Sequence, residues 1–169
     1  MPAQPTPRKR GSSDGGKSTP DPASVVLAFL EALTEFDLDA ALDLVTEDLT
    51  YVNVSLPTIR GRDGLDRAFR PLLRPDRFGF NVHLNHVATQ GSVVLTDRID
   101  EINFRRFASR FWVYGRWVVR DGQIAVWRDS FDWLDVTVAN VRGLLGLLSP
   151  SLNRTMPEGR ARGCGLARG

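Results

Sequence analysis

Hydrophobic positions recur at helical spacing in the first ordered part of the chain. From Asp21 to Phe36 the apolar residues fall three or four positions apart, which predicts an amphipathic helix with one face toward a core. Asp21 supplies an N-cap, and Pro22 fits the first helical turn. The core-facing positions of this helix are Val26, Phe29, Leu30 and Leu33.

Two shorter helices and one strand are predicted next. Residues 37–45 form a helix capped by Asp37, and residues 49–55 alternate between apolar and polar side chains as a strand does. A third helix fits residues 63–73, with Asp63 as its cap. The expected inward-facing residues of these two helices are Leu38, Ala41, Leu42, Val45, Leu65, Phe69 and Leu72.

The remaining chain takes the two-residue period of β-strands. Asp121 and Gly122 predict a tight hairpin turn between the last two strands, and residues 134–148 predict a closing apolar helix that is too short to span a bilayer. The predicted strands cover residues 78–88, 92–104, 109–120 and 123–131. Helices followed by antiparallel strands predict an α+β domain, in which a curved sheet carries helices on its concave face.

Composition and charge divide the chain into one domain and two tails. The length of 169 residues suits a single domain, which we expect over residues 21–150. Residues 1–20 predict a disordered leader and residues 151–169 a flexible basic tail, because both are poor in apolar residues.

Charge and cysteine usage exclude several classes of function. Residues 1–22 carry a net charge of +2 and residues 150–169 a net charge of +3, which leaves the middle of the chain at about −3. An acidic domain does not attract nucleic acid. The one cysteine, Cys164, lies in the tail and cannot form an internal disulfide. No signal peptide or membrane segment is expected at the N-terminus, so we expect a cytoplasmic protein.

No metal or other cofactor is expected. His83 and His86 are the two histidines, and in a regular strand they would face opposite sides of the sheet. One metal ion could not then bind both side chains.

Polar residues are embedded among apolar ones on three of the predicted strands. Residues two apart share a face, so Tyr51 lies beside Asn53, and Arg98 beside Asp100. Asp129 shares its face with Trp127 and Phe131, while Arg128 points the other way. If these faces form the concave side, Arg98 can bridge two buried carboxylates. The alternative is that these charges are solvated pairs at the rim of the sheet, as we expect for Arg128 and Asp132.

Four segments resemble the limonene-1,2-epoxide hydrolase family in order and separation. They are "STPDPASVVLAFLEAL" at 18–33, "YVN" at 51–53, "TDRID" at 96–100 and "WRDSFD" at 127–132. The resemblance covers about residues 18–150 and is closest to a mycobacterial and actinobacterial branch, whose members end in a "GLL" helix followed by "PSL".

The resemblance implies a cone-shaped fold of the nuclear transport factor 2 type, a homodimer, and one-step hydrolysis of epoxides to vicinal diols without a covalent intermediate. In that family's scheme, Asp129 is the general base, and Tyr51 and Asn53 hold the attacking water. Asp100 is the general acid, and Arg98 lies between the two carboxylates. The partners would be an apolar epoxide and water.

Epoxide opening is compatible with these residue types on chemical grounds. The reaction needs one protonated and one ionised carboxylate together, and two neighbouring carboxylates share a proton readily. Apolar surroundings favour the protonated acid, whereas Arg98 favours both anions. An α/β-hydrolase mechanism is excluded, because the chain lacks alternating βα units and a nucleophile elbow. A ketosteroid-isomerase-like enzyme and a non-catalytic binding module remain as alternatives.

The expected pocket is mostly apolar and predicts a bulky apolar epoxide as substrate. We expect residues 136–148 to cover either the pocket mouth or a contact between subunits, because this segment is apolar around much of its circumference. The expected pocket residues besides the polar ones are Phe29, Leu33, Val94, Ile102, Trp127 and Phe131.

Overall fold

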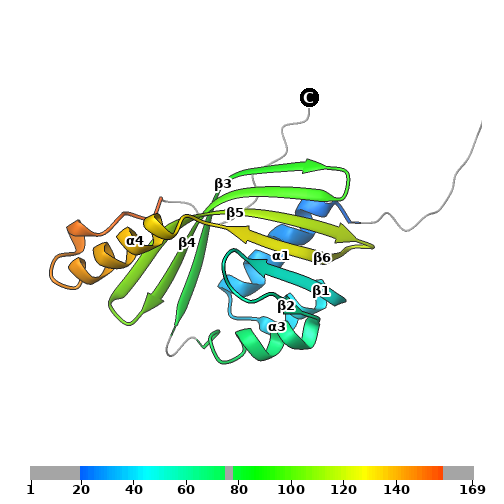
Figure 1. Ribbon diagram of the computed structural model, residues 1–169, viewed down its shortest axis with the longest axis horizontal. Helices are drawn as coiled ribbons and strands as arrows, with labels where there is room; N and C mark the ends of the chain where they lie inside the picture. Colours follow the sequence, from blue (N-terminus) through cyan, green and yellow to red (C-terminus); the bar gives the residue numbers. More distant parts are fainter. Residues whose placement is uncertain (1–19, 75–77, 158–169) are drawn as a thin grey trace, which may run out of the picture.

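The fold is a curved six-stranded sheet with helices on its concave face (Figure 1). The computed structural model describes residues 20–74 and 78–157. The predicted leader therefore lies outside the described residues except for Pro20, as do Cys164 and the end of the predicted tail. The helices are α1 (Pro22–Thr34), α2 (Leu38–Asp43), α3 (Arg62–Phe69) and α4 (Trp133–Leu145).

The sheet is mixed, because its first and last long strands run parallel. The strand order is β2-β1-β6-β5-β4-β3, with β1 parallel to β6 and all other neighbours antiparallel. The predicted turn between β5 and β6 is confirmed, since Asp121 and Gly122 both adopt positive φ angles, of 52° and 79°. The strands are β1 (Val45–Asn53), β2 (Ile59–Arg60), β3 (Gly79–Gln90), β4 (Val93–Phe104), β5 (Phe107–Arg120) and β6 (Gln123–Ser130).

The first helix forms as predicted and packs on the concave face. The Asp21 side chain accepts a hydrogen bond from the Ser24 N–H and thereby caps the helix. The ring of Phe29 meets the ring of Trp127 on β6 edge-on, at 5.1 Å between centroids. Trp127 in turn stacks between Tyr51 on β1, at 3.9 Å, and Trp117 on β5, at 5.1 Å. This aromatic row joins three strands and forms the floor beneath the helix.

Three predicted boundaries are wrong, each for a local reason. Val45 begins β1 and pairs with β6, instead of ending the second helix. The third helix begins after Gly61, so Asp63 lies in its first turn and is not the cap. It ends at Phe69 because Pro71 follows, and Leu72, which was expected to be buried, is 53% exposed. The short strand β2 was not predicted.

Helix α4 seals the free edge of β5, at the end of the sheet that β6 does not reach (Figure 1). Asp135 on α4 accepts the N–H of Trp112 at 3.0 Å, which satisfies a strand donor without a sheet partner. Asn153 donates to the Ala108 carbonyl at 2.9 Å, and Arg154 forms an ion pair with Asp135 at 3.0 Å. The body of the protein therefore extends to Arg154, past the predicted limit at residue 150.

Asp132 has a structural role that the sequence analysis did not assign to it. It was expected to be a rim charge, and it is exposed, but its carboxylate accepts the Leu134 N–H at 2.7 Å and caps α4. In the described part of the chain, no helix is long and apolar enough to cross a membrane.

Candidate active site

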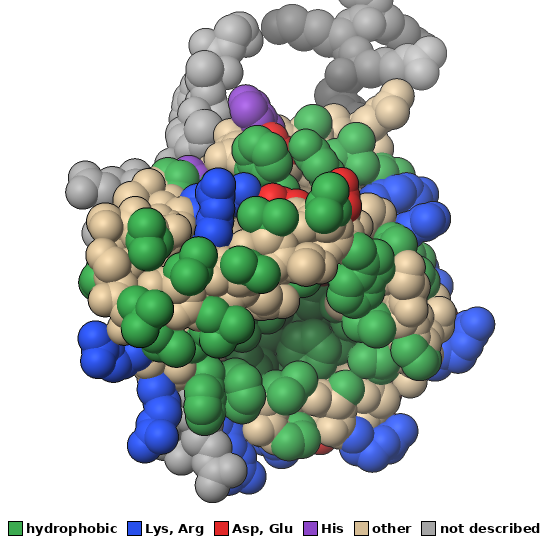
Figure 2. Space-filling model, turned by 60° about the vertical axis from the view of Figure 1, so that its left-hand side comes forward, with side chains coloured by type: hydrophobic (Ala, Val, Ile, Leu, Met, Phe, Trp, Pro, Cys, Tyr) green, Lys and Arg blue, Asp and Glu red, His purple; other side chains and the backbone are tan. Residues whose placement is uncertain are grey.

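A pocket of about 560 Å³ opens between the concave face of the sheet and the helices. Apolar side chains line most of it, and Figure 2 shows the hollow ringed by hydrophobic groups. Helix α4 contributes Trp133, Val136 and Asn140 to the wall, so its position agrees with the first of the two expected for residues 136–148, the pocket mouth or a contact between subunits. The polar lining comes mainly from the strands: Tyr51, Asn53, Asp100, Ser109 and Asp129.

Two buried carboxylates in the pocket wall share one guanidinium. Arg98 donates from Nε to Asp100 at 2.8 Å and from Nη2 to Asp129 at 2.7 Å. Only 1% of Arg98, 6% of Asp100 and 4% of Asp129 is exposed. Charged groups at such burial persist when they are paired and hydrogen-bonded. The alternative reading of these charges as solvated rim pairs is therefore wrong.

The guanidinium reaches Asp129 by passing over β5. Arg98 lies on β4 and Asp129 on β6, with β5 between them, and the β5 residue paired with Asp129 is Gly115. A Cβ at position 115 would lie 2.7 Å from Trp117 Nε1 and closer still to Arg98 Nη1 and Thr96 Oγ1. The absence of a side chain at Gly115 thus leaves the space that Arg98 occupies.

The remaining guanidinium nitrogen is also fixed. Arg98 Nη1 donates to Thr96 Oγ1 at 3.2 Å, and Trp117 Nε1 donates to the same oxygen at 3.1 Å. The guanidinium carbon lies 5.6 Å from the Trp117 ring centroid, within the range of a cation–π contact. Arg98 is held by two carboxylates, a hydroxyl and an aromatic face, so its orientation is strongly constrained.

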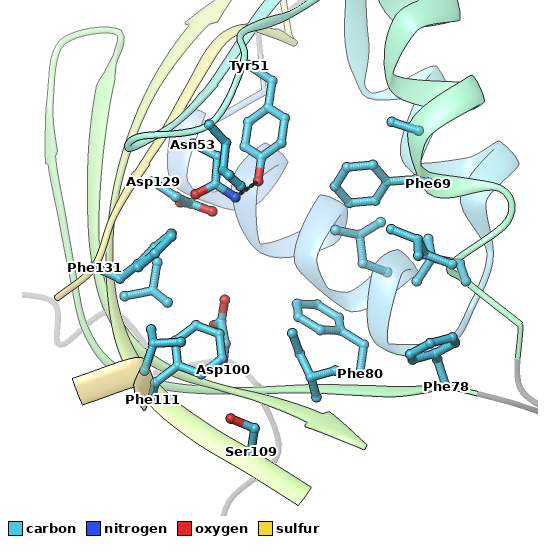
Figure 3. Close-up of a pocket in the computed structure, with 18 of the residues that line it drawn as sticks. Tyr51, Asn53, Phe69, Phe78, Phe80, Asp100, Ser109, Phe111, Asp129 and Phe131 are labelled. Atoms are coloured by element: carbon cyan, nitrogen blue, oxygen red, sulfur yellow. Dashed lines mark hydrogen bonds between the residues drawn. The ribbon is translucent and has the colours of Figure 1, made fainter. Parts of the chain in front are cut away.

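Oxygen atoms of Tyr51, Asn53 and Asp129 lie together in the pocket (Figure 3). Asn53 donates to the Tyr51 hydroxyl oxygen at 2.8 Å, and Asn53 is the β1 residue paired with Asp129 on β6. Among the described residues, neither Asn53 Oδ1 nor Asp129 Oδ1 has a hydrogen-bond partner, although both atoms are buried. Two acceptors and one hydroxyl group together suit a small donor molecule such as water.

Burial sets the protonation preferences of the site. Desolvation raises the pKa of Asp100 to about 6, although the charge of Arg98 acts in the opposite direction. Burial and the nearby charge of Asp129 also raise the pKa of Tyr51, so this phenol stays protonated. The pKa of Arg98 is raised as well, because the two carboxylates outweigh its desolvation.

The structure brings all five predicted site residues together, but two predicted wall residues lie elsewhere. Ile102, Trp127, Phe131 and Leu33 line the pocket as expected. Val94 and Phe29 do not: both are fully buried in the core beneath it. Alternation along a strand identifies a face, but it does not separate the part of that face covered by a helix from the part left open.

The two histidines occupy one face of the sheet, contrary to the prediction. An irregularity between Leu84 and His86 shifts the register, so that His83 pairs with Ile99 and His86 with Asp97. Because Ile99 and Asp97 share a face, the histidines do too, on the side away from the pocket. His86 lies 3.1 Å from the Asp97 carboxylate.

Gly115 and Thr96 support the site, and neither was assigned a role from the sequence. A glycine inside a strand of bulky residues is a detectable signal, since it often marks a close approach. For Thr96, the sequence signals are its place two residues before Arg98 on the same face and its position in the "TDRID" segment.

Residues 20–142 match the family model of the limonene-1,2-epoxide hydrolase catalytic domain. The chain is 39% identical to epoxide hydrolase EphG of Mycobacterium tuberculosis (strain ATCC 25618 / H37Rv) over 133 residues, which are 78% of this chain and 87% of the relative.

Solved structures agree with these matches. A structure of an M. tuberculosis epoxide hydrolase, described as LEH-like, superposes with a TM-score of 0.75 at 36% identity, covering 80% of this chain and 95% of the other. An NTF2-like protein of unknown function from Cytophaga hutchinsonii ATCC 33406 gives a TM-score of 0.55 at 21% identity, covering 69% and 94%. The second likeness concerns the fold alone and confirms the expected NTF2-like architecture.

Replacing Gly115 by alanine should destabilise the protein. Glycine to alanine inside a strand ordinarily gains about 0.5–1 kcal/mol, but here the added methyl group would collide with Arg98, Thr96 and Trp117. We expect a net loss of about 1–3 kcal/mol in the free energy of unfolding, measured by urea titration. The control is Gly64→Ala in α3, whose added methyl group meets only a side-chain methyl of Ile59 at 3.3 Å and should therefore cost much less than Gly115→Ala. Stabilisation by Gly115→Ala would show that the space is not required.

Proposed function

The chain belongs to the limonene-1,2-epoxide hydrolase family and is an epoxide hydrolase, and on that premise we propose its mechanism and substrate. The protein adds water to a bulky apolar epoxide in one step of general acid and base catalysis, giving a vicinal diol. The observation that carries this proposal is the buried pair Asp100 and Asp129, bridged by Arg98 at the wall of an apolar pocket.

In the proposed mechanism Asp129 is the general base. Its Oδ1 and the Oδ1 of Asn53 accept the two protons of a water molecule, and the Tyr51 hydroxyl donates to the water oxygen. This assignment is supported by the two unpartnered acceptors and by the Asn53 amide, which occupies the Tyr51 oxygen as an acceptor and leaves the phenolic proton to point elsewhere. Water held in this way presents its lone pair to the pocket.

Asp100 is the proposed general acid. Its carboxyl group lines the same pocket, and burial raises its pKa to about 6, so a protonated fraction is present near neutral pH. As water attacks one epoxide carbon, Asp129 takes a proton from the water. The carbon–oxygen bond breaks, and Asp100 gives its proton to the leaving oxygen. Return of a proton from Asp129 to Asp100 restores the starting state.

Arg98 would keep the two carboxyl groups in different protonation states. It gives Asp129 one hydrogen bond, at 2.7 Å, and leaves the second oxygen of that carboxylate free to act as a base. The same guanidinium holds Asp100 by bonds of 2.8 and 3.3 Å, the longer from Nη2. A positive charge here also stabilises the oxygen anion that develops as the ring opens.

The pocket supports a lipophilic substrate. A volume of about 560 Å³ suits a molecule of terpenoid or short lipid size, and phenylalanine, leucine and tryptophan side chains form most of its wall. We therefore propose that small polar epoxides react poorly. Glycidol outperforming every lipophilic epoxide in a diol assay would contradict this proposal.

The geometry favours catalysis over the two alternatives. A ketosteroid-isomerase-like site would need an uncharged pocket around its acidic donors, whereas here a guanidinium contacts both carboxylates. A non-catalytic binding module was expected to have exposed or scattered site residues. Four of the five are buried, and the fifth, Asn53, is half-buried against Tyr51.

We propose that the protein forms the homodimer expected from the family resemblance. Leu95, Trp112 and Tyr114 on the convex face of the sheet are each about half exposed, at 52%, 49% and 58%. An apolar cluster of this kind is typical of a covered surface, and a second copy of the chain is the proposed partner. A molar mass of one chain by light scattering would contradict this.

Replacing either carboxyl group by an amide should abolish most diol formation. We expect Asp100→Asn and Asp129→Asn each to lower kcat by about 100-fold or more, because an amide can neither donate the acidic proton nor accept one from water. Tyr51→Phe should be milder, about tenfold, since two water contacts remain. The matched control is Asp97→Asn, on the same strand as Asp100 but on the opposite face. Near-normal turnover by either carboxamide variant would contradict the assignment.

The pH dependence of kcat/KM should follow the protonation of Asp100. Because the pKa of Asp100 is raised to about 6, its protonated form declines as pH rises through that value. We expect kcat/KM for an apolar epoxide to fall above about pH 6. This decrease should be absent from the pH profile of Asp100→Asn. A kcat/KM that rises steadily from pH 5 to pH 8 in the wild type would be incompatible with Asp100 as the acid.

A further inference from the structure

One buried hydroxyl group of the pocket has no part in the mechanism. Ser109 on β5 is 3% exposed and lines the pocket. Its hydroxyl oxygen has no hydrogen-bond partner among the described residues. Its neighbours on the same wall are apolar: Phe107 and Phe111 along β5, and Ile102 opposite on β4.

Trp127 Nε1 is also buried without a partner, but Ser109 differs in this respect from the buried threonine and charged residues of the described chain. Each of the others makes at least one hydrogen bond: they are Thr46, Thr96, Arg98, Asp100, Glu101 and Asp129. A buried hydroxyl without a partner costs free energy, whereas alanine at the same position would cost none. A hydrogen-bonding atom of a bound substrate would supply the partner that the protein itself does not provide.

The sheet register places Ser109 at a defined distance from the reacting groups. Asp100 pairs with Phe111, and Ile102 pairs with Ser109, so Ser109 lies one two-residue step from the acid. That step is about 7 Å along the strands. In Figure 3, Ser109 lies beyond Asp100, on the side away from Tyr51 and Asn53. An epoxide protonated by Asp100 would therefore extend its remaining atoms along the wall toward Ser109.

We propose that Ser109 is a specificity-determining residue, which hydrogen-bonds a second oxygen atom of the substrate. The preferred substrate is then an apolar epoxide that carries one hydroxyl or carbonyl group several bonds from the ring. This inference rests on the proposed function, because Asp100 fixes the epoxide end of the molecule. A pocket that binds a substrate hydroxyl discriminates against the analogue that lacks it, since the protein group is then left unpaired.

Two epoxides that differ by one hydroxyl test the inference. The first is the 1,2-epoxide of p-menth-1-ene, and the second is the same epoxide with a hydroxyl at C8, on the far side of the ring. We expect the wild type to show about tenfold higher kcat/KM for the hydroxylated compound. Ser109→Ala should remove that preference and leave kcat/KM for the other compound unchanged or slightly higher. The control Ser130→Ala alters a serine of β6 outside the pocket and should keep the wild-type ratio.

Binding measurements separate the inference from the proposed function. Trp127 lines the pocket, so quenching of tryptophan fluorescence gives dissociation constants for both compounds without turnover. If neither compound yields diol, the proposed substrate class fails, and the ratio of dissociation constants still tests Ser109. The inference is overturned if the ratio of the two dissociation constants is the same in the wild type and in Ser109→Ala. It is also overturned if Ser109→Ala weakens the binding of both compounds equally, because Ser109 would then only support the pocket wall. A failure to bind either compound overturns it too.

Discussion

The site depends on one interaction, the bridge from Arg98 to Asp100 and Asp129. Without the bridge, two carboxylates this deeply buried would be protonated or would repel one another. Removal of one member of a buried ion pair lowers the stability of a protein by about 3–5 kcal/mol. The bridge in turn requires a residue without a side chain at Gly115 on β5, the hydroxyl group of Thr96 and the ring face of Trp117. The aromatic row of the core therefore supports the catalytic group directly.

Much of this arrangement could be predicted from the sequence, because side chains two residues apart in a strand lie on the same face of the sheet. Alternation placed Tyr51 beside Asn53 and Arg98 beside Asp100, and Asp121 and Gly122 predicted the turn of the last hairpin, although the register then shifts between Val118 and Val119. The capped first helix followed from Asp21 and Pro22. Each of these inferences uses contacts within a few residues, where spacing alone decides which side chains share a face.

What could not be predicted depends on contacts between distant segments. The order of the strands decides that β5 lies between Arg98 and Asp129, so the need for Gly115 becomes visible only in the folded sheet. A register irregularity beside His86 reversed the expected face of one histidine. Val94 and Phe29 share the periodicity of pocket residues, yet packing by α1 removes them from the pocket wall. The unpartnered hydroxyl of Ser109 likewise has no sequence signal.

The central claim is that water, held by Asp129, Asn53 and Tyr51, attacks the epoxide directly. A single turnover in ¹⁸O-labelled water with enzyme in excess over a lipophilic epoxide tests it, because an attacking carboxylate would pass its own oxygen to the diol. We expect the new diol oxygen to carry the solvent label completely and mass spectrometry to show no covalent adduct. A diol in which neither oxygen carries the label after this single turnover, or an ester on Asp129 or Asp100, would contradict it.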